Sequence, residues 1–345
     1  MPTDIRALPP AVVPGQQQDW LDRRLPAMDE VRPGVWSVSI PFHNNPMRMT
    51  YCYLLTGPDG ILVVDPGWDS EEGWEVFGRA LAGQGLDRAD VTGVLVTHFH
   101  PDHLAMARRV ADHTGAWIGL HPADQAVLAG MADRERFDRR QAEWLTWAGL
   151  PAEELASYRN RHRLIDVARM TEGPFRDLTD GAVLPTHAGP ARVLHTPGHT
   201  PGHVCLVLDE AGLLFSGDHI LPKISPTMAF GPDRGADPLA DYLRSLQRCA
   251  DLGDLEVAPA HEYRFLGLPA RAQALIEDHR SRLAEVRATV DGGAQLLHEI
   301  ASRIGWRRPW TEMDLVNRFI AMSETDCYAS YLARRGEISW RPFTG

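Results

Sequence analysis

The stretch of sequence that decides the fold is THFHPDH, residues 97–103. It follows residues 91–96, a short run rich in β-branched residues that is typical of a buried strand, and it leads into a helical pattern. Histidine and aspartate are common protein ligands of divalent metal ions, and the stretch contains His98, His100, Asp102 and His103. In an extended chain the first two point to the same side, whereas the last two fall where the chain turns toward the helix. The stretch predicts ligands for two metal positions, and the alternative is a polar loop with coincidental histidines.

Three later segments place further ligand-type residues at the ends of expected strands. HTPGHTPGH holds His199 between two Pro-Gly turns, which fix a side chain on rigid, irregular backbone. FSGDH ends a strand pattern with Asp218, and APAHE ends another with His261. The strands expected around these segments span residues 191–194, 204–208, 212–215 and 255–258. Because binding sites are often assembled from such loops, these segments favour a metal centre over the polar loop.

Together these motifs resemble the metallo-β-lactamase superfamily in its glyoxalase II-like branch, over roughly residues 34–265. The resemblance implies an α/β fold, the four-layer αββα sandwich, with the site at one edge. It implies that one metal ion is bound by His98, His100 and His199, that a second is bound by Asp102, His103 and His261, and that Asp218 bridges the two. Asp65, in VVDPG, matches a further family motif whose aspartate supports the site without binding metal.

The implied centre predicts a metal-dependent hydrolase. Two divalent ions bridged by a carboxylate can share a water molecule and lower its pKa from ~15.7 toward ~7, which supplies hydroxide at neutral pH. Asp102 and Asp218 are the expected catalytic residues, with Asp102 orienting the hydroxide. Zinc is the expected metal, and iron and manganese are alternatives that the same ligands accept. No protein nucleophile is expected, because the chain lacks a GxSxG elbow.

Patterning divides the 345 residues into three parts. A Pro- and Gln-rich lead-in, 1–33, precedes the metallo-β-lactamase domain, 34–268, which carries a helical insertion over the site at about 122–169. Residues 269–345 predict a separate helical module that ends in a short β-wing at 336–340. This tail resembles the winged-helix tail of the β-lactamase-like endoribonuclease branch.

Composition limits the partners. The net charge of −11 disfavours nucleic acid and anionic membranes. The sequence shows neither an export signal nor an apolar stretch of about 20 residues, so a cytoplasmic location without membrane contact is expected. The scattered cysteines, which lack CxxC spacing, are expected to be reduced and mostly buried: Cys52, Cys205, Cys249 and Cys327.

Residues beside the ligand motifs are candidates for substrate contacts. Lys223, Tyr263 and Arg264 extend the Asp218 and His261 motifs into segments expected to rim the pocket, where they would bind an anionic or polar part of a small-molecule substrate. The alternative is that Tyr263 and Arg264 pack against the tail helices. Three further histidines are expected to support the ligands through hydrogen bonds and not to bind metal: His195, His203 and His219.

The leading hypothesis for the reaction is hydrolysis of an ester-like carbonyl, in a thioester or a lactone. The alternative is a phosphodiesterase or endoribonuclease whose C-terminal domain contacts nucleic acid. Against that alternative, the basic residues of the tail are offset by acidic ones, whereas a nucleic-acid-binding winged helix shows a basic stripe. A third hypothesis gives the tail a role in homodimerisation or in shaping the pocket.

Overall fold

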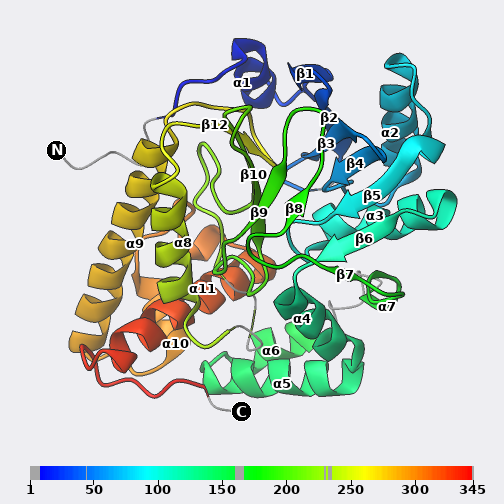
Figure 1. Ribbon diagram of the computed structural model, residues 1–345. Coiled ribbons are helices and arrows are strands. Elements are labelled where there is room, and N and C mark those ends of the chain that lie inside the picture. Colours follow the sequence, from blue (N-terminus) through cyan, green and yellow to red (C-terminus); the bar gives the residue numbers. More distant parts are fainter. Residues whose placement is uncertain (1–7, 44, 160–166, 229–230, 232–234, 344–345) are drawn as a thin grey trace.

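Two β-sheets lie face to face, and helices cover the outer face of each sheet (Figure 1). The computed structural model describes residues 8–43, 45–159, 167–228, 231 and 235–343. Three apolar cores separate the layers: one between the sheets and one beneath the helices on each side. This arrangement confirms the predicted αββα sandwich.

The first sheet contains, within the described residues, seven strands in the order β1 to β7. They are β1 (Asp29–Arg32), β2 (Val35–Pro41), β3 (Met49–Gly57), β4 (Gly60–Val64), β5 (Val91–Leu95), β6 (Trp117–Leu120) and β7 (Arg176–Asp177). Strands β1 to β4 pair antiparallel, and β4 to β7 pair parallel. β4 and β5 therefore end at the same edge, where the THFHPDH stretch begins.

The second sheet has the order β12-β11-β10-β9-β8 in the described part of the chain. Its strands are β8 (Val183–Leu184), β9 (Ala191–His195), β10 (Val204–Leu208), β11 (Leu213–Gly217) and β12 (Glu256–Pro259). β8 to β11 pair antiparallel, and β11 pairs parallel with β12. Because β9, β11 and β12 run in the same direction, the three later ligand segments leave the sheet at one edge.

Side chains alternate between the two faces of each sheet, as the pleat of a strand requires. In β3, Tyr51 and Tyr53 point into the core between the sheets, whereas Cys52 and Leu54 face the outer helices. β10 alternates in the same way between the inter-sheet core and the core on its other side. These two central strands are therefore buried on both faces, and each fully buried Leu or Val side chain contributes about 1.5–3 kcal/mol of transfer free energy.

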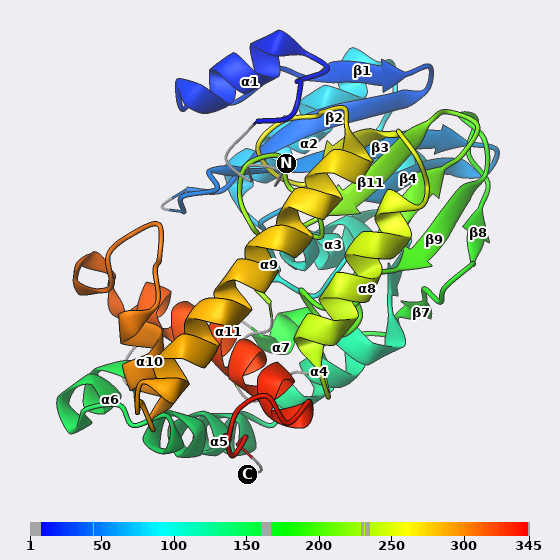
Figure 2. The same cartoon turned by 90° about the vertical axis from the view of Figure 1, so that its left-hand side faces the viewer.

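The outer layers are formed by α2 (Glu71–Gly83) and α3 (Pro101–Thr114) on the first sheet and by α8 (Pro238–Ala250) and α9 (Leu268–Asp291) on the second (Figure 2). Capping residues set where these helices begin. Ser70 accepts a hydrogen bond from the Gly73 amide at 3.0 Å, and α3 and α8 each have proline in the first helical position. No helix in the described ranges is both long and apolar enough to cross a membrane.

The predicted helical insertion is present as α4 (Pro122–Ala132), α5 (Arg134–Trp147), α6 (Ala152–Arg159) and α7 (Val167–Met170), and its residues 160–166 lie outside the described residues. It is joined to α11 (Leu315–Arg334) by a separate apolar cluster that includes Trp144 and Phe319. The indole Nε1 of Trp144, which is fully buried, donates a hydrogen bond to Asp326 Oδ2 at 2.9 Å. The insertion is thus anchored to the C-terminal part of the chain.

The N-terminal lead-in has more structure than a lead-in implies. It contains α1 (Pro14–Leu21) and the edge strand β1. The Val12 amide donates a hydrogen bond to the Arg264 carbonyl at 3.0 Å, so this segment lies against the sandwich. The periodicity of apolar residues did not predict either element, because prolines interrupt the pattern near the start of this segment.

The C-terminal region does not form the predicted winged helix. α9 packs along α8, and its apolar residues share one core with the second sheet, with α10 (Leu297–Arg303) and with α11. Residues 269–291 are therefore part of the sandwich's outer layer and not of a separate module. The prediction of a β-wing at 336–340 is wrong, because this described segment contains no strand. Its apolar residues pack singly against helices, Ile338 in the shared core and Trp340 against Trp147.

Replacing Trp144 by phenylalanine removes the indole donor to Asp326 and leaves unfilled volume in a fully packed cluster. We expect Trp144→Phe to lower the free energy of unfolding by about 2–3 kcal/mol, measured by urea denaturation. Trp147→Phe is the matched control, because Trp147 is only partly buried in the same cluster, and it should cost less than about 1 kcal/mol. Equal losses in both variants would show that the hydrogen bond to Asp326 does not anchor the insertion.

Candidate metal centre

The predicted ligands meet at one edge of the sandwich, each on the segment that follows a strand or begins a helix. His98 and His100 follow β5, His199 follows β9, Asp218 follows β11 and His261 follows β12. Asp102 and His103 lie in the first turn of α3. The structure therefore brings together all seven predicted ligands from four segments of the chain.

One group, the trihistidine set, consists of His98, His100 and His199. Its nitrogens lie within hydrogen-bonding distance of one another: His98 Nε2 is 2.9 Å from His100 Nδ1, and His199 Nε2 is 3.2 Å and 3.1 Å from these two atoms. Three imidazole nitrogens that face a common point are a typical zinc-type donor set.

The second group, the carboxylate set, consists of Asp102, His103, Asp218 and His261. His261 Nε2 lies 3.4 Å from Asp102 Oδ2 and 3.3 Å from Asp218 Oδ1, and His103 Nε2 lies 3.6 Å from Asp218 Oδ1. The other oxygen of Asp218, Oδ2, is 3.8 Å from His199 Nε2. Asp218 therefore faces both sets with different oxygens, as a bridging ligand does.

Two of the histidine ligands have their other ring nitrogen on a carbonyl oxygen, which fixes their tautomers. His199 Nδ1 lies 2.6 Å from the Thr227 carbonyl, and His261 Nδ1 lies 2.7 Å from the Met49 carbonyl. Since a carbonyl only accepts, these Nδ1 atoms carry the proton in the neutral imidazoles. Their Nε2 lone pairs are then directed into the cluster.

The site therefore fits divalent metal ions. In the trihistidine set, the neutral His98 and His199 rings direct Nε2 lone pairs at each other, because their Nδ1 atoms lie on Thr97 Oγ1 and on the Thr227 carbonyl. Three atoms of the carboxylate set, His103 Nε2, Asp218 Oδ1 and His261 Nε2, are buried and make no hydrogen bond with any described residue. Buried polar atoms without partners are costly, and cations between these donors would satisfy them.

Without metal, the two sets hold protons differently. Burial lowers the pKa of His98, His100 and His199, and for His100 the pKa falls to about 3. Burial also opposes protonation of His261, but the Asp218 and Asp102 carboxylates outweigh it and raise the pKa of His261 to about 10. The pKa of His103 is raised well above its usual value by neighbouring carboxylates in the same way. Metal ions must therefore displace protons from the carboxylate set only.

Asp65 holds the first ligand stretch from behind, as the predicted supporting residue. Its Oδ2 accepts from His103 Nδ1 at 2.9 Å and from Thr97 Oγ1 at 2.7 Å, and its Oδ1 accepts from the Thr97 amide at 2.8 Å. Thr97 Oγ1 in turn lies 3.1 Å from His98 Nδ1. The backbone of Asp65 has φ of 51°, a left-handed conformation that is costly for a residue with a Cβ and is held by these contacts.

Two later turns are held as tightly. Gly198, just before His199, has φ of 136°, and a Cβ there would lie 2.4 Å from the Tyr242 Cβ of α8, so only glycine fits. His203 accepts a hydrogen bond at Nε2 from the Asp218 amide at 3.2 Å, which agrees with its predicted supporting role. The backbone of the bridging ligand is thereby fixed.

A cavity of about 360 Å³ opens onto this centre. It is reached by His100, Asp102, His199, Asp218 and His261, and the rest of its wall is mainly apolar. The apolar residues come from the insertion, the loops and α11: Met47, Phe99, Val127, Met131, Phe137, Met170, Leu221, Ile224 and Ile320. We refer to it as the apolar cavity.

Lys223, Tyr263 and Arg264 do not line the apolar cavity, so their predicted contacts with substrate there are wrong. Arg264 is buried and forms ion pairs with Glu256 and Asp29. Tyr263 is buried beside Trp20. The Lys223 ammonium lies over the Trp20 ring, 4.5 Å from its centroid. The backbone amide of Lys223 donates a hydrogen bond to Glu262 Oε2 at 2.7 Å. The side chains of Tyr263 and Arg264 turn into the protein, where Arg264 is held by acidic residues of β1 and β12.

Asp124, at the start of α4, is a functional residue that the sequence argument missed. Its carboxylate is fully buried and accepts from the Phe99 amide at 3.0 Å, from Thr200 Oγ1 at 2.8 Å and from the Gly202 amide at 2.6 Å. Burial raises the pKa of Asp124 to about 7 against these donors. It ties the loop of His98 and His100 to the loop of His199. An acid in the first turn of a helix is common, so the sequence gives no sign of this role.

An αββα sandwich with clustered histidines and aspartates at its edge defines a metal-binding hydrolase class, and the chain belongs to the metallo-beta-lactamase superfamily. The profile described as "Metallo-beta-lactamase superfamily" matches residues 46–261. A Bacillus subtilis (strain 168) protein named probable metallo-hydrolase YqjP is 24% identical over 282 residues, covering 79% of this chain and 84% of that protein. The lactamase-like protein adaB of Aspergillus niger is 27% identical over 277 residues, covering 78% and 69%.

Two solved structures share the fold over most of the chain. A metallo-beta-lactamase family protein from Thermus thermophilus is 29% identical, with a TM-score of 0.74 and coverage of 89% of this chain and 95% of that chain. A beta-lactamase domain protein from Burkholderia ambifaria is 27% identical, with a TM-score of 0.79 and coverage of 92% of each. The chain is thus a metallo-hydrolase of this superfamily with a His/Asp cluster able to bind metal.

Metal loading should release protons. In the metal-free protein His103 and His261 are protonated at neutral pH because their pKa values are raised, and a protonated nitrogen does not bind metal. We expect one proton to be released from each, none from the trihistidine set, and metal affinity to rise with pH. Titration calorimetry with Zn²⁺ in buffers of different ionisation enthalpy gives the number released, which should fall in His261→Ala. Heats that do not depend on the buffer would contradict these protonation states.

Three donors bind the Asp124 carboxylate. Asp124→Asn keeps only one acceptor oxygen for them and adds an amide nitrogen, which is itself a donor. We expect metal affinity to fall about 10–100-fold, as for other residues that orient ligands, measured by competition with a chromophoric chelator. Asp112→Asn is the matched control on the exposed face of α3 and should leave affinity unchanged. Parental affinity in Asp124→Asn would mean that the two loops hold their positions without it.

Proposed function

We propose that the protein is a dinuclear metal-dependent hydrolase that cleaves acyl thioesters, with lactones as the next candidate substrates. The observation that carries the proposal is the apolar cavity, whose wall of methionine, phenylalanine and aliphatic side chains ends at the ligand cluster. Such a cavity accepts a hydrocarbon acyl group and brings its carbonyl carbon beside the metal centre.

The trihistidine set would hold one ion, Asp102, His103 and His261 the other, and Asp218 would bridge them. Divalent ions there, zinc being our proposal, supply a water molecule of lowered pKa and polarise the substrate carbonyl. Asp102 Oδ2 lies 3.4 Å from His261 Nε2 at the cavity wall, where it is placed to accept a proton from the attacking water and orient it. Asp218 fixes the spacing of the two sets.

The cysteines and Thr200 are not placed to attack a substrate. All four cysteines are buried free thiols, and none of them lines the apolar cavity. Thr200, which does line it, donates its hydroxyl proton to Asp124. This placement supports attack by water and not by a side chain.

One relative supports a thioester substrate. A Claviceps purpurea protein named atrochrysone carboxyl ACP thioesterase is 24% identical over 266 residues, which cover 76% of this chain and 67% of that protein. We place the chain in the glyoxalase II-like branch on its sequence motifs, and a thioester substrate agrees with that placement.

The nuclease alternative rested on a winged-helix tail. The C-terminal helices instead belong to the sandwich layer, and the described segment 336–340 contains no strand that could form a wing. The tail instead contributes Ile320 of α11 to the apolar cavity. A homodimer formed through this region, a cytoplasmic location and a small-molecule substrate stay predictions. Sedimentation analysis of the full chain tests the first of these.

A panel of acyl thioester, lactone, phosphodiester and β-lactam substrates tests the proposed reaction. We expect the acyl thioester to have the highest kcat/KM, and Asp218→Ala to lower it by at least about 100-fold because both metal positions lose a ligand. Asp209→Ala, at an exposed aspartate paired with Arg192, is the matched control and should keep parental activity. Hydrolysis by Asp218→Ala at the parental rate would refute the site, and preference for the phosphodiester would refute the substrate class.

A further inference from the structure

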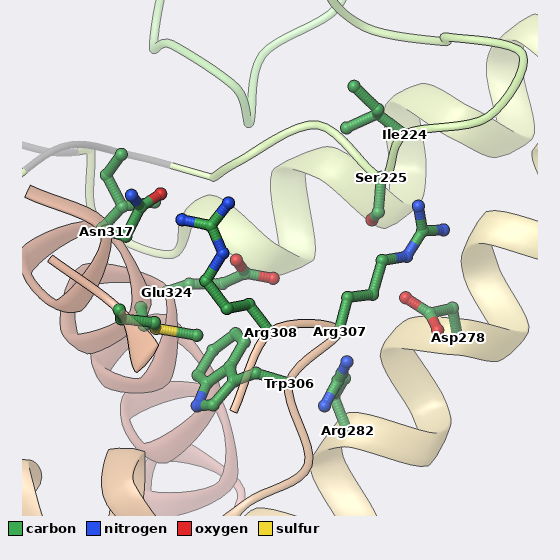
Figure 3. Close-up of a pocket in the computed structure, with 12 residues that line it drawn as sticks. Ile224, Ser225, Asp278, Arg282, Trp306, Arg307, Arg308, Asn317 and Glu324 are labelled. Atoms are coloured by element: carbon green, nitrogen blue, oxygen red, sulfur yellow. The ribbon is translucent and has the colours of Figure 1, made fainter. Parts of the chain in front are cut away.

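A second cavity, of about 210 Å³, is drawn in Figure 3. It lies beside the apolar cavity, with which it shares lining residues. It lies between α9, α11, the loop after α10 and the segment of Ile224 and Ser225, and its wall contains Arg282, Arg307 and Arg308. We call it the arginine cavity. Three guanidinium groups around one cavity are notable in a chain whose net charge is −11, because cationic hollows concentrate anions whatever the total charge.

Of the three arginines only Arg282 forms an ion pair within the described part of the chain, with Glu285 at 3.5 Å. Arg308 makes no hydrogen bond or ion pair with any described residue, Arg307 donates to the Lys223 carbonyl at 3.1 Å, and Arg282 lies over the Trp306 ring. Figure 3 shows Arg307 and Arg308 extending from one loop with their guanidinium groups on different sides of the hollow. Guanidinium N–H groups that are free to converge are well suited to phosphate oxygens.

Two carboxyl groups, of Asp278 and Glu324, also line the arginine cavity. Neither forms an ion pair with the three arginines in the described part of the chain. Burial raises the pKa of Glu324 to about 7 and raises the pKa of Asp278 above its usual value. Glu324 therefore offsets the cationic charge less than an exposed acid would.

The two cavities share part of one wall, because Ile224 and Ile320 line both of them. A bound molecule that passes between these side chains would have one end at the metal-binding cluster and the other end among the arginines. The first end is in apolar surroundings and the second in cationic surroundings. A substrate that fits both has an apolar acyl group and an anionic group on the other side of its scissile bond.

We propose that the arginine cavity binds a phosphate group on the thiol half of an acyl thioester, while the apolar cavity holds the acyl half. This inference rests on the proposed thioesterase function. The chemistry that fits is a phosphorylated pantetheine thiol, which occurs in coenzyme A and in the prosthetic arm of carrier proteins. Arg308, as the unpaired cation, is the specificity-determining residue.

Steady-state kinetics on matched substrates test the proposal. The same acyl group is presented on coenzyme A, on 4′-phosphopantetheine and on pantetheine, which lacks the phosphate. We expect Arg308→Ala to raise KM for the phosphorylated substrates about tenfold, the loss of one charge-assisted contact, with kcat and the pantetheine KM unchanged. Arg280→Ala is the matched control on α9, because Arg280 is exposed and lies outside the cavity. An equal rise in KM for the pantetheine substrate, or no rise for any substrate, would overturn the proposal.

Direct binding separates this proposal from the thioesterase proposal. Calorimetry compares coenzyme A, 4′-phosphopantetheine and pantetheine, which share the same thiol, on the metal-loaded protein. Tighter binding of the phosphorylated thiols that is lost in Arg308→Ala supports the arginine cavity even if no thioester is hydrolysed. If 4′-phosphopantetheine keeps the advantage, the phosphate next to pantetheine is bound, and if only coenzyme A does, its nucleotide phosphates are bound. Equal binding of all three thiols would refute the arginine cavity and leave the proposed hydrolysis standing.

Discussion

This structure depends on metal-ligand atoms whose unshared electron pairs face one another at the edge of the sandwich. His98, His100 and His199 direct ring nitrogens at one another over about 3 Å, and Asp218 approaches both ligand sets in a buried environment. Without a cation such an arrangement is unfavourable, because the burial that excludes water also strengthens the repulsion of like partial charges. The rest of the fold must hold these atoms in place against that cost.

Contacts from several parts of the fold hold the ligand atoms in place. The Met49 carbonyl at the start of β3 fixes His261, and Asp65 at the end of β4 fixes His103. Asp124 of the insertion then connects the loops after β5 and β9. Because these supports come from the first sheet and from the insertion, the packing of both parts of the fold determines where the ligands lie. The insertion is therefore part of the metal centre's support as well as a cover for the cavity.

The ligands were predictable from the sequence because each lies in a short motif directly after a strand. His98 and Asp218 are examples, and the family resemblance that these motifs carry implied the four layers. Contacts that depend on how distant segments meet were not predictable. Arg264 carries the same local signal as a substrate-binding arginine, and only the fold shows that Glu256 and Asp29 surround it. Asp124 resembles any acid in a first helical turn, although its carboxylate is turned toward two ligand loops.

The C-terminal region gives the fullest case of tertiary context deciding the outcome. Its apolar periodicity predicted helices correctly, but periodicity does not say which surface an apolar face will cover. The second sheet exposes an outer apolar face that α8 alone does not cover, and α9 buries its own apolar face there, so the supposed module becomes a layer of the sandwich. α11 is then held beside the insertion, where Ile320 reaches the wall shared by the two cavities. The metal centre is common to a superfamily, whereas the walls that select a substrate come from the insertion and this region. Differences in substrate among relatives should therefore lie in those segments and not in the ligands.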